Sequence, residues 1–146
     1  MTAPEALIDT NILGYVFDAD VPTKRAVSRD LLARCWNGEV TFAVSVQNLA
    51  EFAVVVTEKV AFPMPPSVVR SFIETILNFD GWKVISYRGS TIQDALAIKE
   101  KYSLHFWDAL IVATMQEHGI HQIYTEDRGF AKVPGCIPVN PYEMCV

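Results

Sequence analysis

The stretch His105-Phe106-Trp107-Asp108-Ala109-Leu110-Ile111-Val112-Ala113-Thr114-Met115, which Gly119 and then Gln122-Ile123-Tyr124-Thr125 follow, decides how this chain folds. Its first part has the length and apolar content of a mostly buried helix, which we expect over 106–118 with Gly119 as its end. Its last part is a short apolar strand. A buried helix that leads directly into a buried strand is typical of α/β proteins.

The same alternation continues along the chain. We expect strands over 5–9, 40–44, 82–86, 122–125 and 137–139, and helices over 23–36, 45–58, 67–79, 90–102 and 106–118, with a short helical turn over 127–131. The helix over 67–79 should end at a turn at Asp80-Gly81. The first strand should end in a turn at Thr10-Asn11, and Ser45 and Ser67 should cap the helices that follow them. These segments predict an α/β fold with a parallel sheet of four to five strands and helices on both faces. We find no repeat or linker, so we expect one domain over 1–146.

The composition says more about the fold than about the function. The 146 residues are 51% hydrophobic, which is ample for a core, and the net charge of −5 argues against a dedicated nucleic-acid binder. Setting aside four of the 17 acids for a metal site leaves about −1, so the acidity counts only weakly against a nucleic-acid substrate. No apolar run is long enough for a membrane span, and no secretory signal is visible. We therefore expect a cytoplasmic protein with no membrane partner.

Three cysteines, Cys35, Cys136 and Cys145, are too few and too scattered for a disulfide framework or a zinc site. We expect reduced thiols, with Cys35 packed on a helix and Cys145 near a loose end. His105, His118 and His121 fall on a helix start, a helix end and a strand start. We expect these histidines to be structural or exposed.

Four acids stand in surroundings where an ionised side chain is costly. Asp108 lies in the apolar stretch quoted above, Asp9 follows Ala6-Leu7-Ile8, Glu51 lies in Leu49-Ala50-Glu51-Phe52, and Asp127 follows Ile123-Tyr124-Thr125. A carboxylate in low dielectric needs a paired charge, hydrogen bonds or a metal ion. Sites in parallel sheets form beyond the carboxyl ends of the strands, which is where these acids are expected. The pattern favours one acidic site that binds a hard dication.

The alternative is that each acid is a solvated charge or a helix cap. It fits Asp108 and Glu51 poorly, because their neighbours leave no clearly polar helical face. Asn11 and Thr125 are either supporting groups that orient carboxylates or ordinary turn residues. Glu126 is either a further ligand or a helix-start acid, and we prefer the second.

Four motifs in this order resemble the PIN-domain ribonucleases, especially the VapC toxins of toxin–antitoxin pairs. The motifs are Leu7-Ile8-Asp9-Thr10-Asn11-Ile12-Leu13, Ser45-Val46-Gln47-Asn48-Leu49-Ala50-Glu51-Phe52, Asp108-Ala109-Leu110-Ile111-Val112-Ala113 and Thr125-Glu126-Asp127-Arg128-Gly129-Phe130. The resemblance implies Asp9, Glu51, Asp108 and Asp127 as the catalytic and metal-binding acids, with Asn11 and Thr125 as supporting groups. It also implies Mg²⁺ or Mn²⁺, a homodimer and a small antitoxin partner.

The expected function is a metal-dependent endoribonuclease that hydrolyses RNA phosphodiester bonds, as the toxin of a toxin–antitoxin pair. The alternative is a non-catalytic PIN-like scaffold that binds RNA or protein. A haloacid-dehalogenase type of phosphatase with Asp9 as nucleophile fares badly, because Asn11 stands where that class has its second Asp.

Two further groups of residues have both a structural and an RNA-binding interpretation. A helical face carries Lys24, Arg25, Arg29 and Arg34, and we prefer a solvated face over an RNA contact. The aromatic residues Phe72, Phe79, Trp82 and Trp107 are expected in the core or in dimer contacts, rather than as base-stacking platforms.

Overall fold

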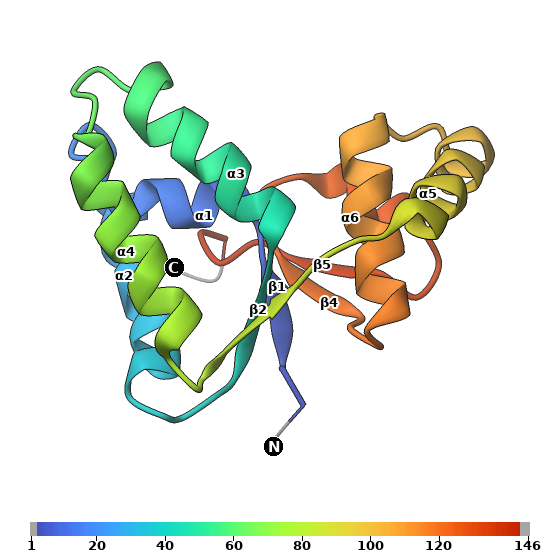
Figure 1. Cartoon of the computed structure of the whole chain (residues 1–146), viewed down its shortest axis with the longest axis horizontal. Helices are drawn as coiled ribbons and strands as arrows, with labels where there is room; N and C mark the ends of the chain where they lie inside the picture. Colours follow the sequence, from blue (N-terminus) through green and yellow to red (C-terminus); the bar gives the residue numbers. More distant parts are fainter. Residues whose placement is uncertain (1–2, 144–146) are drawn as a thin grey trace.

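The computed structural model describes residues 3–143 and shows a parallel five-stranded sheet with helices on both faces (Figure 1). The strand order is β3-β2-β1-β4-β5, and every neighbouring pair is parallel. The elements along the chain are β1 (Ala6–Ile8), α1 (Thr10–Tyr15), α2 (Pro22–Trp36), β2 (Phe42–Ser45), α3 (Val46–Val54), the π-helical turn η1 (Val55–Lys59), α4 (Pro66–Asn78), β3 (Trp82–Ile85), α5 (Gly89–Tyr102), α6 (Phe106–Glu117), β4 (Gln122–Tyr124), the 3₁₀ turn η2 (Arg128–Lys132) and β5 (Ile137–Val139). The predicted fold class is confirmed.

Strand β1 is the centre of the sheet, and both of its faces are covered. Leu7 pairs with Ala43 of β2 on one side and with Ile123 of β4 on the other. Ala6, Leu7 and Ile8 are all fully buried. Because successive side chains in a strand point to opposite faces, complete burial of three in a row requires packed layers on both sides of the sheet.

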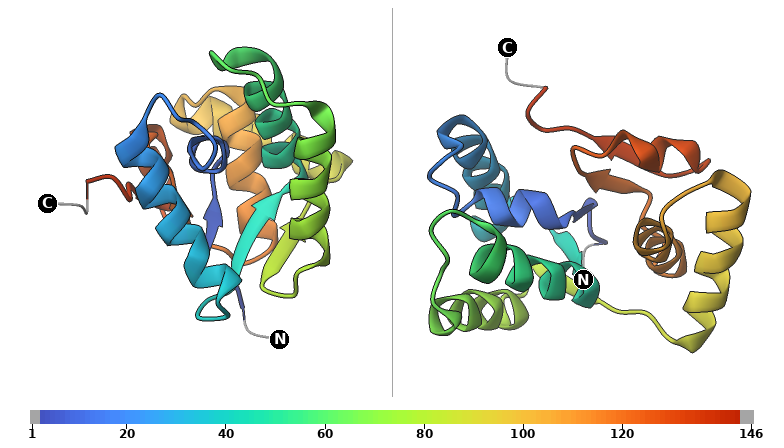
Figure 2. Two further views of the ribbon diagram at one scale, coloured as in Figure 1. Left: turned by 90° about the vertical axis from the view of Figure 1, so that its left-hand side faces the viewer. Right: turned by 90° about the horizontal axis from the view of Figure 1, so that it is seen from above.

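The two layers use different parts of the chain. Helices α1 to α4 cover one face, and α5 and α6 cover the other, so the sheet lies between them (Figures 1 and 2). Ile8 packs in the first layer with residues such as Leu32 and Phe52, whereas Leu7 packs in the second with residues such as Leu110 and Phe130. Strands β2 and β3 lie on one side of β1, and β4 and β5 lie on the other. The direction in which strands are added to the sheet therefore reverses at β1. In open parallel sheets that reversal is where ligands bind.

One local prediction is wrong. Thr10-Asn11 is no turn but the start of helix α1, and Asp9 is the N-cap, its side chain accepting a hydrogen bond from the Thr10 amide. Ile12 and Leu13 are fully buried in the core beside the sheet. Tertiary burial of these two side chains therefore stabilises a helix too short to be stable by itself.

Other predicted boundaries shift by small amounts. Ser45 caps α3 as expected, but the α-helix ends at Val54 and continues as the π-helical turn. The predicted cap at Ser67 is wrong, because Pro66 occupies the first helical position and Pro65 provides no side-chain cap. Within residues 3–143, no helix is long and apolar enough to cross a membrane.

Two of the cysteines can be assessed. Cys35 is buried on α2 as expected, where its thiol donates to the carbonyl of Gly81 at 3.2 Å. Cys136 is a half-buried free thiol. Cys145 lies outside the described residues.

The packing of α3 gives a first prediction. Phe52 is fully buried, and its ring lies 6.0 Å from that of Phe17 and 5.5 Å from that of Phe72. Phe52→Ala should lower the free energy of unfolding by about 3–5 kcal/mol in urea denaturation, because it leaves a cavity in the core. The control Val68→Ala, at a position 46% exposed on α4, should change it by about 0.5 kcal/mol or less. Equal losses for the two variants would contradict this packing.

Candidate active site

The four predicted acids line one pocket at the carboxyl edge of the sheet. The pocket has a volume of about 660 Å³ and receives Asp9, Glu51, Asp108 and Asp127 from four separate parts of the chain. Asp9 follows β1, Glu51 lies in α3, Asp108 lies in the first turn of α6, and Asp127 comes shortly after β4. The carboxylates thus converge as the strand-end argument predicts. The expected supporting residue Asn11 also lines this pocket.

Asp9 is the most constrained of the acids. Its side chain is 8% exposed, and its Oδ1 accepts hydrogen bonds from the Thr10 amide at 2.9 Å and from Asn48 Nδ2 at 3.4 Å. Its Oδ2 accepts from the Thr125 hydroxyl at 2.7 Å. Burial raises the pKa of Asp9, and the hydrogen bonds from Thr125 and Thr10 oppose that rise. These donors hold the carboxylate in one orientation.

Thr125 is buried behind the pocket and links two of the acids. Its hydroxyl donates to Asp9 and accepts from the backbone amide of Asp127 at 3.0 Å. One side chain at the end of β4 therefore fixes the acid after β1 and the start of the segment that carries Asp127.

Glu51 is held by side chains at the start of α1 and α3. Its Oε2 accepts from the Thr10 hydroxyl at 3.1 Å, and its Oε1 accepts from Gln47 Nε2 at 2.8 Å. The same Gln47 nitrogen donates to the backbone carbonyl of Trp107 at 3.0 Å. Gln47 therefore ties the Glu51 carboxylate to the first turn of α6, one residue before Asp108.

Asp108 has a raised pKa, and within residues 3–143 few groups stabilise its negative charge. Partial burial raises its pKa to about 6, and the negative charges of Asp127 and Asp9 add to the rise. Within residues 3–143, its side chain has no hydrogen-bond or salt-bridge partner. Its place in the first turn of α6 puts it near the positive end of the helix dipole, which favours the ionised form.

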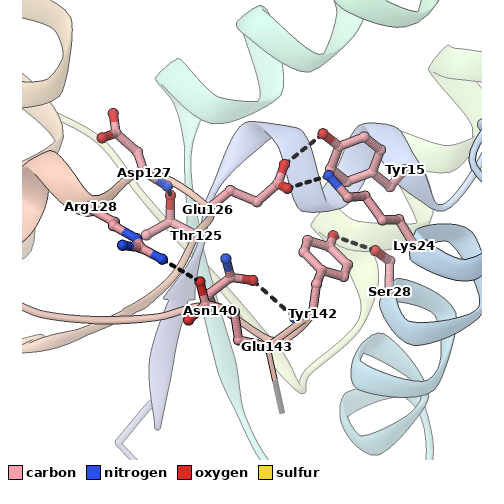
Figure 3. Close-up of polar contacts among 10 residues, drawn as sticks. All are labelled: Tyr15, Lys24, Ser28, Thr125, Glu126, Asp127, Arg128, Asn140, Tyr142 and Glu143. Atoms are coloured by element: carbon pink, nitrogen blue, oxygen red, sulfur yellow. Dashed lines mark hydrogen bonds and ion pairs between the residues drawn. The ribbon is translucent and has the colours of Figure 1, made fainter. Parts of the chain in front are cut away.

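Glu126 and Asp127 are neighbours in sequence with different surroundings. Figure 3 shows Glu126 turned toward Tyr15 and Lys24, with Asp127 pointing away from them. Glu126 accepts from the Tyr15 hydroxyl and forms a salt bridge with Lys24, and it does not line the pocket. Glu126 is therefore an internal ion-pair partner, which neither of the two sequence interpretations included. Asp127 is exposed, and its Oδ1 accepts from the Gly129 amide at 2.8 Å.

The residue types around the pocket fit a hard dication. Carboxylate oxygens are the ligands such ions prefer, and none of the four acids forms a salt bridge within the described residues. As the side chains stand in residues 3–143, no three His, Cys, Asp or Glu residues are close enough together to hold one ion. The donor chemistry is thus assembled, and enclosing an ion between three of these groups requires some side-chain movement.

The basic helical face is mostly engaged within the protein. Besides the Lys24–Glu126 pair, Arg29 donates to the carbonyl of Val16 at 2.9 Å, and Arg34 lies 3.4 Å from Glu5. None of the basic residues of α2 lines the pocket. Internal contacts, and not solvation alone, account for this charge.

The histidines are structural or exposed, as expected. His105 and His121 are exposed, and His118 Nδ1 lies 2.8 Å from the carbonyl of Thr114 in its own helix.

Several residues in or behind the pocket were not assigned a contact from the sequence. Gln47, which lines the pocket, and Asn48, which is buried behind it, fall one turn before Glu51, and that spacing indicated only a polar stripe. Lys59, Tyr87 and Trp107 also line the pocket, and nothing in their sequence surroundings predicts that placement. Of the two expected placements, core or dimer contact, the core is wrong for Trp107, which is 58% exposed, and a dimer contact of Trp107 stays a prediction. Trp82 is 5% exposed and does belong to the core.

The model of the PIN domain family matches residues 6–135 of this sequence. The chain belongs to the PIN-domain family. The matched range includes β1, β4 and all four acids of the pocket. A search of the curated proteins gave no match.

Solved PIN-like structures share the fold over almost their whole length. A toxin–antitoxin complex from Klebsiella pneumoniae is 25% identical, with a TM-score of 0.61, and the match covers 94% of this chain and 98% of that chain. VapBC2 from Rickettsia felis, bound to a fragment of promoter DNA, is 18% identical with a TM-score of 0.62 and coverage of 92% and 97%. VapC20 from Mycobacterium tuberculosis, described as a Sarcin-Ricin loop cleaving toxin, is 17% identical with a TM-score of 0.57 and coverage of 84% and 89%. The last two similarities concern the fold.

The role of Thr125 gives a second prediction. Thr125→Val removes the hydroxyl and leaves Asp9 Oδ2 buried without its shortest hydrogen bond. We expect the free energy of unfolding at neutral pH to fall by about 2 kcal/mol in urea denaturation. Thr125→Ser keeps the hydroxyl and should lose about 1 kcal/mol or less. A Ser variant that loses as much stability as the Val variant, or more, would contradict this prediction, because the methyl group would then matter at least as much as the hydrogen bond.

A third prediction concerns the charge of Asp108. Since its pKa is raised in the folded state, the folded protein binds the proton more tightly than the unfolded chain, and ionisation lowers stability as the pH rises toward and past about 6. In EDTA, Asp108→Asn should therefore stabilise the protein at neutral pH, by about 1 kcal/mol after solvent screening.

The pH dependence is the control for that variant. The advantage of Asn should shrink as the pH falls below about 6 and vanish below the ordinary Asp pKa of about 4, because Asp108 is then protonated in both states. Urea denaturation across this range measures the difference. A constant difference at all pH values would contradict the electrostatic cause.

Proposed function

We propose that this PIN-domain protein is a metal-dependent endoribonuclease that hydrolyses RNA phosphodiester bonds. The supporting observation is that four carboxylates from separate elements line one pocket at the strand-order reversal without any salt bridge among the described residues. Four acids around one pocket without a paired cation among the described residues are costly, and a bound dication would offset that cost. The alternative of a non-catalytic scaffold gives no reason to keep all four acids.

In this proposal, Asp9, Glu51, Asp108 and Asp127 hold Mg²⁺ or Mn²⁺. A dication bound there activates water and neutralises charge on the phosphate. The chain's own contribution is preorganisation, since Thr125, Thr10 and Asn48 fix Asp9, and Gln47 fixes Glu51. Asn11 lines the same pocket and is exposed there, which supports its proposed role as a supporting group.

We further propose that the chain acts as the toxin of a toxin–antitoxin pair. The structural neighbours from Klebsiella pneumoniae and Rickettsia felis are complexes of this kind, which supports a small antitoxin as partner. A homodimer, action on RNA in the cytoplasm, and a single domain over the whole chain belong to the same proposal. A short neighbouring gene for a DNA-binding protein would support the antitoxin.

The test is cleavage of a mixed RNA pool with Mg²⁺ or Mn²⁺. Asp9→Asn, Glu51→Gln, Asp108→Asn and Asp127→Asn should each lower the cleavage rate about 100-fold or more, because each removes a charge that holds the metal. EDTA should abolish cleavage by the wild type. Asp94→Asn, a matched change of an exposed acid on α5, should leave the rate unchanged. Cleavage that persists in EDTA and in the Asp9 variant would refute the metal-nuclease mechanism, whereas no cleavage of any RNA would favour the scaffold.

A further inference from the structure

The wall of the acidic pocket carries an exposed tryptophan that the proposed hydrolysis does not use. Trp107 is 58% exposed and lines the pocket beside Asp108, its neighbour in sequence. A second aromatic residue of the pocket wall, Tyr87, is 38% exposed and comes from the segment between β3 and α5. Large aromatic side chains usually bury most of their surface, so their exposure at a site of polar chemistry requires an explanation.

The Trp107 residue is braced rather than loose. Gln47 Nε2 donates to its backbone carbonyl, and the same nitrogen binds Glu51, so the position of Trp107 is tied to that of an acid. The ring of Phe106 lies 5.3 Å from the ring of Trp107, at an interplanar angle of 73°. An edge-on neighbour of this kind supports the indole and leaves much of its surface open.

The same pocket contains a lysine without an internal partner. Lys59, at the end of η1, lines the pocket and is exposed. Within residues 3–143, no carboxylate lies within salt-bridge distance of it. Lys24 of α2, by contrast, is paired with Glu126. Lys59 is thus a cation available to a phosphate group near the acids.

We propose that Trp107 is the stacking platform for an unpaired nucleobase of the RNA substrate, with Lys59 on a neighbouring phosphate. The proposal rests on the ribonuclease function above and assigns to it the two side chains of the pocket wall that bind the substrate. A base inside a duplex has both faces covered by its neighbours, whereas an unpaired base can stack on an aromatic ring. Stacking on Trp107 holds the adjoining backbone beside Asp108, and it selects for strand state more than for base identity.

RNA explains this wall of the pocket better than a protein contact does. A purely apolar protein contact would account for the exposed aromatic area alone. It would not account for the shared position of the indole, an unpaired lysine and four acids around one pocket. An aromatic face, a cation and a proposed metal site are the groups that a base, a phosphate and a scissile bond require.

Binding, measured separately from cleavage, tests the proposal. The probe is a short fluorescein-labelled single-stranded RNA of mixed sequence, titrated by anisotropy into the full chain carrying Asp9→Asn. Adding Trp107→Leu should weaken binding about 10-fold, equivalent to about 1.4 kcal/mol. Trp107→Phe should retain most of the affinity. The matched control Phe62→Leu, at a position 78% exposed outside this pocket, should leave it unchanged.

Two further measurements, fluorescence quenching and the salt dependence of binding, separate stacking on Trp107 from a merely structural role of this residue. Single-stranded RNA should quench the tryptophan fluorescence of the Asp9 variant. The quenching should vanish with Trp107→Phe, since Trp82 is in the core and the half-buried Trp36 lies on α2 and does not line the pocket. The same RNA annealed to its complement should quench little. Lys59→Gln should reduce the slope of log affinity against log salt by about 1.

The contradicting results are distinct from failure of the nuclease proposal. Unchanged affinity with Trp107→Leu, equal quenching by duplex, or an unchanged salt slope with Lys59→Gln would overturn the stacking proposal. So would a Trp107→Leu variant that binds RNA normally but loses self-association in sedimentation, because Trp107 would then be a protein contact. Failure of the nuclease proposal is seen in the cleavage assay instead. It would be cleavage that is unaffected by EDTA and by the acid variants, or no cleavage of any RNA.

Discussion

The burial of one carboxylate constrains much of this structure. Asp9 is 8% exposed at the end of the central strand, and burial raises its pKa. The charge is tolerable only because donors arrive from three places: the start of α1, the start of α3 and the end of β4. These places meet only if β1 pairs with β2 on one side and β4 on the other, as it does. The hydrogen bonds that stabilise Asp9 therefore depend on this strand order.

The region also shows how acids are sorted between structural and chemical roles. Glu126 is neutralised internally by Lys24 and Tyr15, and burial together with this carboxylate raises the pKa of Tyr15 to about 12. Asp127, the next residue, points away from these two side chains (Figure 3) and lines the pocket, and it forms no salt bridge within residues 3–143. Along an extended backbone successive side chains point in opposite directions, so two adjacent acids can belong to different environments. An acid with its own lysine contributes little to the negative field of the pocket.

The sequence contained enough information to predict the sheet and the convergence of the four acids. Short apolar strands between helices fix the parallel topology, and the topology fixes which loop ends share an edge. The contacts between residues distant in sequence could not be predicted. The start of α1 depends on an Asp9 cap that Thr125 also holds, and the partner of Lys24 lies across the fold on another strand end. Local propensity contains no trace of either interaction.

Helix α6 shows why an apolar stretch can mislead about its first turn. Its residues from Ala109 through Met115 are all buried, so this part of the helix is enclosed by packing on every side. Trp107 and Asp108 precede this anchored part and extend from it into the pocket. A helix buried all round cannot rotate or slide without loss of packing, so the backbone at its start keeps a fixed position. The apolar composition that makes Trp107 look like a core residue is thus the reason that the backbone carrying an aromatic residue and an acid, side by side in sequence, is held at one site.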